Sequence, residues 1–256
     1  MRRRKTIMPA KTHHTHRELL RVDDNAPFQF TEAYKSLRTN IEFLSSATEC
    51  KSILITSSVP EEGKSNVAVN LAMTMASAGK KVILVDADLR KGTLSRHLHV
   101  SKSRSHSGVT SMLTGNADWK DVLIPMPEPN LILVPAGPNP PNPAEMLASP
   151  KMKAFMDMLV KYADCVIIDT PPVSVVTDAA VLSQYVDGVL LVVRPAVTTI
   201  QGAQLSKKNL ESVNARVLGV VINGYDTKKS SRKDGYYYSY SYDYYSNGPK
   251  KSGSGK

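Results

Sequence analysis

The sequence has only two cysteines, Cys50 and Cys165, and their separation matches no cysteine motif. Cys165 lies in an apolar stretch, so we expect neither a disulfide framework nor a cysteine metal site, and the pair fits a reducing cytoplasm. Long apolar runs are also missing, because a run such as VLLVV at 189–193 is far too short to cross a bilayer. The N-terminus is basic but has no apolar segment after the basic residues, so it does not resemble a secretory signal.

The middle of the chain lacks a charge excess, although the net charge over 256 residues is +10. Residues 1–22 contain seven Lys/Arg against Glu18 alone, and residues 225–256 contain seven Lys/Arg against three Asp. The intervening residues are neutral, so the body is not an evident nucleic-acid surface. The two basic ends could contact anionic lipid, nucleic acid or an acidic protein.

Short apolar runs alternate with segments of helical periodicity along the middle of the chain. Strands are expected at 53–57, 81–85, 130–135, 165–168, 188–193 and 216–222. Helices are expected between them, including one that ends near Tyr162 and one at 175–185, whereas the basic segment 91–107 is expected as loop. Such alternation predicts right-handed crossovers and a parallel sheet in a three-layer α/β domain. We expect a disordered basic arm at 1–27, this domain at 28–224, and a tail at 225–256.

The first strand leads into a glycine-containing loop and then a helix, in the segment ILITSSVPEEGKSN at 53–66. Gly63-Lys64-Ser65 at the start of a helix is typical of a phosphate-binding P-loop, in which backbone N–H groups and the helix dipole favour an anion. Lys64 would add a cation for the phosphates and Ser65 a hydroxyl for Mg²⁺. Ser58 replaces the usual first glycine, and an ordinary strand-to-helix turn is the alternative. The predicted nucleotide contacts are Ser58, Val59, Pro60, Glu61, Glu62, Gly63, Lys64, Ser65 and Asn66.

Three aspartates follow apolar strands. Asp86 and Asp88 come just after 81–85, and Asp169 follows CVII at 165–168. The ligand crevice of an open α/β sheet lies beyond the carboxyl ends of its strands, so Asp86 and Asp88 are expected to face the phosphates, and Asp169 is expected on the metal side of the same site. A buried carboxylate needs a partner, and Mg²⁺ is suitable beside a P-loop. For Asp86 and Asp88 the alternative is helix N-capping or a loop salt bridge to Arg90.

The predicted helix at 28–44 has Glu32, Lys35 and Arg38 one turn apart on its polar face. Surface ion pairing is the simpler interpretation, and a subunit contact is the functional one.

The tail contains seven of the eleven tyrosines of the chain, at Tyr236, Tyr237, Tyr238, Tyr240, Tyr242, Tyr244 and Tyr245. A sticky low-complexity segment, a stacking platform for single-stranded nucleic acid and a set of phosphorylation sites are all consistent with it.

Together these segments resemble the bacterial tyrosine kinases (BY-kinases) of capsule and exopolysaccharide synthesis, over about residues 28–245. SSVPEEGKS is similar to the Walker A segment, ILVDADLR to the additional Walker A′ segment, and VIIDTPP to Walker B of that family. The tyrosine cluster resembles the family's terminal phosphorylation sites, and GVTSMLTG, PPNPAEML and LGVVIN are also similar to family sequence. The resemblance implies a P-loop fold close to that of the partitioning ATPases.

The resemblance also implies residue roles. Lys64 and Ser65 would bind the phosphates of ATP and Mg²⁺, Asp86 would be the base for the tyrosine hydroxyl, and Asp88 and Asp169 would support the metal. The roles of Asp86 and Asp88 could be exchanged. Asn223 matches the family's adenine contact.

The same resemblance implies partners and a cellular location. Glu32, Lys35 and Arg38 match a subunit-contact motif with Lys35 in place of an arginine, and lysine cannot form the same bidentate contact. The family forms homo-oligomers and phosphorylates its own tyrosine cluster in trans. In its split form, a separate membrane protein activates the kinase at the inner face of the membrane.

Two other functions remain at this point. A partitioning or septum-site ATPase would act as a nucleotide-driven dimer switch, but those proteins have a signature lysine where this chain has Val59. A nucleotide-regulated RNA-binding protein would use the basic, aromatic tail.

Overall fold

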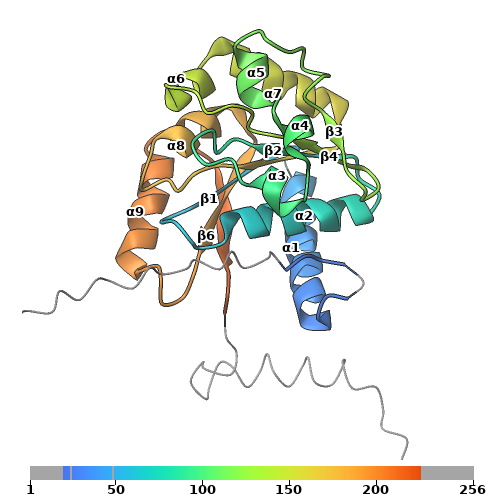
Figure 1. Ribbon diagram of the computed structural model, residues 1–256. Coiled ribbons are helices and arrows are strands. Elements are labelled where there is room, and N and C mark those ends of the chain that lie inside the picture. Colours follow the sequence, from blue (N-terminus) through green and yellow to red (C-terminus); the bar gives the residue numbers. More distant parts are fainter. Residues whose placement is uncertain (1–19, 24, 48, 226–256) are drawn as a thin grey trace, which may run out of the picture.

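The computed structural model describes residues 20–23, 25–47 and 49–225. They form a seven-stranded sheet between two helical layers (Figure 1). The strands are β1 (Ser52–Ser57), β2 (Val82–Asp86), β3 (Ile124–Pro125), β4 (Leu131–Val134), β5 (Cys165–Asp169), β6 (Gly188–Val193) and β7 (Val217–Ile222). Within these residues, no helix is both long and apolar enough to span a membrane.

The strand order is β3-β4-β2-β5-β1-β6-β7, and every pairing is parallel except the one between β3 and β4 at the edge. After β1 the chain crosses to β2 and then to the edge strands β3 and β4. It returns to β5, which lies between β2 and β1, and continues on the opposite side of β1 with β6 and β7. The carboxyl ends of β1, β5 and β2 therefore lie side by side, and Asp86 is in register with Asp169. This arrangement brings the predicted motifs to one edge of the sheet.

The helices are α1 (Phe28–Ala47), α2 (Lys64–Ser77), α3 (Leu94–His97), α4 (Lys102–Ser105), α5 (Val109–Leu113), α6 (Pro143–Leu147), α7 (Pro150–Tyr162), α8 (Asp178–Leu182) and α9 (Ile200–Glu211), and η1 (Ser183–Tyr185) is a 3-10 turn. Local sequence sets several of their starts. The Ser149 hydroxyl accepts a hydrogen bond from the Met152 amide and Pro150 occupies the first turn of α7. Thr199 caps α9 in the same way through the Gly202 amide. Such caps satisfy amides that have no partner within the helix.

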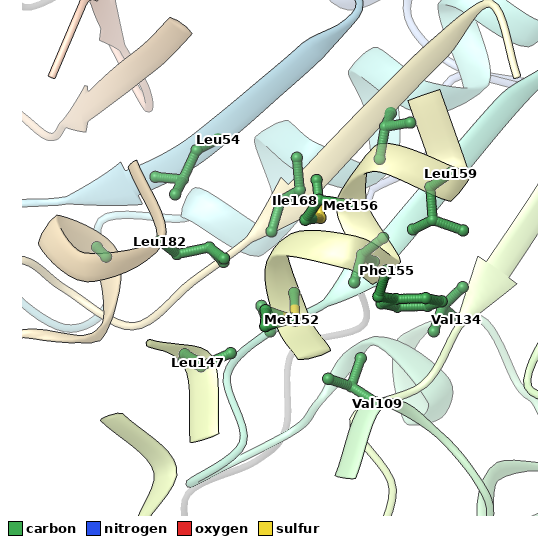
Figure 2. Packing of buried hydrophobic residues seen from close by; sticks show 14 of the residues in the cluster. Leu54, Val109, Val134, Leu147, Met152, Phe155, Met156, Leu159, Ile168 and Leu182 are labelled. Carbon is green, nitrogen blue, oxygen red and sulfur yellow. The ribbon is translucent and has the colours of Figure 1, made fainter. Parts of the chain in front are cut away.

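Alternate side chains of the strands enter two separate cores. Leu54, Val85 and Ile168 face the layer containing α5, α7, α8 and α9, whereas Ile55 and Ile167 face α2 and α1. Figure 2 shows Phe155 and Met156 of α7 lying among side chains of the first core, including Val134 and Ile168. Because the central strands are buried on both faces, their sequences are continuously apolar. The two cores hold the strand ends, and hence the site, in fixed positions.

Four details differ from the expectation. β3 is an additional antiparallel edge strand, whose two residues are too few for a periodic pattern. Segment 91–107, expected as loop, contains the one-turn helices α3 and α4. The helix expected before Tyr162 is divided into α6 and α7, because Pro150 begins a new helix. The helix expected at 175–185 is only α8 followed by the η1 turn.

Candidate functional site

The loop between β1 and α2 folds tightly around a left-handed glycine. Gly63 has φ +88°, and a Cβ at this position would lie 2.0 Å from Nδ2 of Asn223. Only glycine adopts this backbone conformation at little cost, and only glycine fits beside the Asn223 amide. That amide donates to the Glu62 carbonyl oxygen over 2.8 Å, so the end of β7 supports the loop. Asn223, the residue matched to an adenine contact, therefore reaches the P-loop itself.

The predicted loop contacts divide into two groups. Ser58 and Glu62 are fully buried, and the Glu62 carboxylate accepts a hydrogen bond of 2.7 Å from the Val59 amide. In this conformation the Val59 N–H is already bound and cannot serve a phosphate. The predicted residues that do line the adjacent cavity are Pro60, Glu61, Gly63, Lys64, Ser65 and Asn66.

Lys64, at the start of α2, lies between carboxylates from two other strands. Its Nζ is 3.6 Å from Oδ2 of Asp88 and 3.7 Å from Oδ1 of Asp169. Burial alone would lower the pKa of Lys64, but the charges of Asp169, Asp88 and Asp86 outweigh it and raise this pKa. The lysine is therefore fixed as a cation at the mouth of the P-loop.

Asp169 is fully buried at the end of β5, and its Oδ2 accepts a hydrogen bond of 2.6 Å from the Ser65 hydroxyl. Burial raises the pKa of Asp169, opposed by the charge of Lys64 and by the Ser65 hydrogen bond. Its Oδ1 atom is also buried and has no hydrogen-bond partner in the described part of the chain. A carboxylate oxygen in this position is suited to interact with an additional cation.

The donor set fits Mg²⁺ held jointly with phosphates. Mg²⁺ binds through one or two protein oxygen ligands and completes its octahedron with water and substrate oxygens. Ser65 and Asp169 are in contact, and Asp88 is next to Lys64. In the described ranges, no group of three or more His, Cys, Asp or Glu side chains could hold a metal ion. A Mg²⁺ ion bound through Ser65 and Asp169 would take phosphate and water oxygens as its other ligands.

Asp86 lies deeper than expected. Only 1% of it is exposed, and its Oδ2 accepts a hydrogen bond of 3.0 Å from the Leu94 amide at the start of α3. Asp86 thus binds the first amide of α3 from outside the helix, whose N-cap residue is Thr93. The salt bridge considered for Arg90 is not formed with Asp86 or Asp88, because Arg90 forms a bidentate pair with Asp178. Burial, followed by the charge of Asp169, raises the pKa of Asp86 to about 8. A carboxyl group with this pKa can exchange a proton near neutral pH.

The cavity extends from the P-loop and has a volume of about 540 Å³. Of the two aspartates expected to face the phosphates, Asp88 lines this cavity and Asp86 does not; Asp169, expected on the metal side, is also absent from the lining. The remaining lining residues are Arg90, Lys91, Thr93, Arg96, His97, Pro171, Pro172, Val175 and Val176. Sequence reasoning did not select these residues, although segment 91–107 is visibly basic and Pro171-Pro172 follows Asp169.

Helix α1 is connected to the P-loop helix through side chains. The Tyr34 hydroxyl donates to Oδ1 of Asn66 over 3.1 Å, and Arg38 donates to the Thr74 carbonyl oxygen. Burial raises the pKa of Tyr34 well above its usual range. Lys35 pairs with Glu32 at 2.8 Å, as the simpler interpretation of this helix expected.

The tyrosines from Tyr236 to Tyr245 lie outside the described residues.

Comparison with known proteins gives matches over most of the chain. A family model described as an AAA domain matches residues 51–218. The tyrosine-protein kinase YwqD of Bacillus subtilis is 40% identical over 207 residues, covering 81% of this chain and 86% of that protein. The putative tyrosine-protein kinase CapB of Staphylococcus aureus is 34% identical, covering 88% and 96%. Among solved structures, the kinase domain of the Escherichia coli tyrosine kinase ETK has a TM-score of 0.75 at 32% identity, covering 79% of this chain and 78% of that one.

Proposed function

This chain belongs to the bacterial tyrosine-kinase family of P-loop proteins, and on that premise we propose that it transfers the γ-phosphoryl group of ATP to tyrosine. The observation that carries the proposal is the position of Lys64 between Asp88 and Asp169 at the mouth of the P-loop. The alternative of a partitioning or septum-site switch is not supported, because the relatives that align over most of the chain are named tyrosine-protein kinases.

Phosphoryl transfer requires positioning and charge stabilisation more than covalent chemistry. In this proposal the loop amides around Gly63 and the ammonium group of Lys64 bind the β- and γ-phosphates. Ser65, Asp88 and Asp169 would hold Mg²⁺, which neutralises phosphate charge when bound. Asn223 supports the loop through its hydrogen bond to the Glu62 carbonyl oxygen, and in this proposal it would also contact the base of the nucleotide.

The acceptor chemistry needs a base near the γ-phosphate. The tyrosine oxygen forms the new bond to phosphorus, the bond from phosphorus to the β,γ-bridging oxygen breaks, and the phenolic proton leaves to a carboxylate. We assign this role to Asp86 from its place in the ILVDADLR segment. Burial raises its pKa to about 8, so bound Mg²⁺ would have to lower this pKa for the carboxylate to accept the proton at pH 7. Asp88 lines the cavity and is the other candidate, so a comparison of Asp86→Asn with Asp88→Asn in single-turnover transfer separates the two roles.

The proposed substrates include the chain's own tail, at Tyr236–Tyr238, Tyr240, Tyr242, Tyr244 and Tyr245, on a neighbouring subunit of a homo-oligomer. Glu32 and Lys35 on α1 are the proposed contacts, since their side chains are 34% and 51% exposed. Arg38 is more restricted, because it already binds the Thr74 carbonyl oxygen. A membrane-anchored activator of polysaccharide synthesis is the proposed partner, which would place the kinase at the inner face of the membrane.

Transfer between subunits is tested by mixing two variants. Lys64→Met keeps the tyrosine cluster but loses the phosphate cation, and a variant with all seven tail tyrosines changed to phenylalanine keeps the site but loses the acceptors. Incubated with ATP, the mixture should give phosphotyrosine on the Lys64→Met chain, whereas each variant alone should give none. Phosphotyrosine in the wild type but not in the mixture would contradict transfer in trans.

A further inference from the structure

The cavity has a cationic side that the proposed function does not use. Lys91 and Arg96, which we call the basic wall, line it from the segment after β2. Both residues are exposed, and within the described residues neither has a carboxylate partner at ion-pair distance. Neighbouring Arg90 differs, because its guanidinium is occupied by a bidentate contact of 2.8 Å to the buried Asp178. The basic wall therefore presents two cations to whatever enters the cavity.

The basic wall is adjacent to the reacting end of the site. The Lys91 amide donates to Oδ1 of Asp88 over 3.0 Å, and the same carboxylate lies 3.6 Å from Lys64 through its Oδ2. Asn223 follows β7, which lies on the β6 side of β1, whereas the basic wall follows β2 on the opposite side. The nucleotide base and the basic wall are thus separated by the P-loop. An anion at the basic wall would belong to the acceptor and not to the base or sugar.

The tail sequence has a regular spacing of tyrosines. Tyrosines occur at every second position in Tyr236, Tyr238, Tyr240, Tyr242 and Tyr244. In an extended peptide, side chains two residues apart leave the same face and are separated by about 6.8 Å. When one such tyrosine enters the site, the next one along the alternate series is directed to the same side of the cavity.

We propose that the basic wall is a binding site for a phosphotyrosine two residues from the accepting tyrosine. A phosphate monoester brings nearly two negative charges and three acceptor oxygens, which suit a lysine and an arginine that line the same cavity. This inference rests on the proposed kinase function and adds an order to it: each transfer creates the group that holds the next acceptor. Phosphorylation should then proceed along the alternate tyrosines.

The binding test uses synthetic peptides of residues 235–246 in which tyrosines other than Tyr240 and Tyr242 are phenylalanine. Phosphorylation at Tyr242 should tighten binding to the full-length protein roughly tenfold over the peptide with phenylalanine at 242. In Lys91→Met/Arg96→Met the ratio of the two affinities should fall to nearly one. Lys102→Met/Lys161→Met is the matched control, since it removes two exposed charges outside the cavity and should keep the preference. Equal affinities of the wild type for the two peptides would overturn the proposal.

The kinetic test compares kcat/KM for transfer to Tyr240 in the same two peptides. The ratio between primed and unprimed peptide should be roughly ten in the wild type and near one in Lys91→Met/Arg96→Met. A peptide with phosphotyrosine in place of Ser241 should show no increase in kcat/KM for transfer to Tyr240, because adjacent side chains of an extended peptide point to opposite faces. If the variant raises the KM for ATP and keeps the ratio, the wall binds nucleotide phosphate and the inference is wrong. No transfer to either peptide would contradict the kinase function, and the binding test would still decide the subsite.

Discussion

Asp86 gives the most informative single substitution. The residue is only 1% exposed, and burial together with the nearby charge of Asp169 raises the pKa of its carboxyl group to about 8. Asparagine has the same shape and no charge, and its side-chain oxygen can accept the hydrogen bond from the Leu94 amide. We predict that Asp86→Asn stabilises the metal-free protein and at the same time abolishes phosphate transfer. A gain in stability with a loss of activity is expected where an active site stores unfavourable charge.

The direction and size of this stability change follow from the pKa of Asp86 in the folded protein and the pKa of aspartate in the unfolded chain. An unfolded aspartate titrates near 3.8, so the folded state binds the proton more tightly, and the stability that this proton provides is lost as pH rises from about 4 to 8. Each pH unit within this window costs about 1.4 kcal/mol. Asp86→Asn does not titrate and avoids the loss. Its advantage over the wild type should therefore grow by about 3 kcal/mol between pH 5 and pH 7.

The assay is urea unfolding of both proteins at pH 5 and pH 7 with EDTA present and ionic strength held constant. Single-turnover transfer is measured on the same preparations with Mg²⁺ and ATP. An equal stability difference at the two pH values would refute the raised pKa. Transfer by Asp86→Asn at the wild-type rate would refute its role as base, and a loss of ATP binding alone would show that its role had been assigned wrongly.

Three further substitutions test the P-loop and its supports. Lys64→Met should reduce transfer by at least about 10²-fold in single turnover, because it removes the cation from the phosphates, and undiminished transfer by the folded variant would contradict this. Gly63→Ala should lose affinity for a fluorescent ATP analogue, since its Cβ meets Asn223, whereas Gly79→Ala, also at positive φ but in open space, should bind normally. Equal affinities of these two variants would contradict the packing argument. Tyr34→Phe should lower the free energy of unfolding by about 1 kcal/mol through loss of the bond to Asn66, and an unchanged denaturation midpoint would contradict that.

The fold could be predicted from the sequence to the extent that burial leaves a pattern. Strands such as Val82–Asp86 and Cys165–Asp169 are buried on both faces and are continuously apolar, so their positions and the parallel sheet were visible. The edge strand β3 has only two residues, one of them Pro125, and its pairing with β4 is a tertiary contact without a local signal. The division of α6 from α7 depends on Pro150, which the periodicity alone did not reveal.

Some residues of the candidate site could be predicted from the sequence, and the positions of others could not. Lys64, Ser65 and Asp169 are marked by their motifs, and the structure brings them into contact. The depth of Asp86 was not predictable, because it depends on the Leu94 amide of a one-turn helix within a segment that reads as loop. The support of the P-loop by Asn223 is a contact across 161 residues, and no local pattern encodes its geometry. The position of the basic wall relative to the P-loop could not be predicted, because it depends on which side of β1 each strand lies.

The central claim is that this P-loop site phosphorylates tyrosine and does not merely hydrolyse ATP. The most direct measurement is long incubation of the concentrated full-length protein with Mg²⁺ and ATP, followed by intact mass and peptide mapping. We predict mass increments of whole phosphate groups that map to tyrosines between Tyr236 and Tyr245, and none in Lys64→Met. Hydrolysis of ATP to ADP by the wild type without any phosphotyrosine would contradict the account.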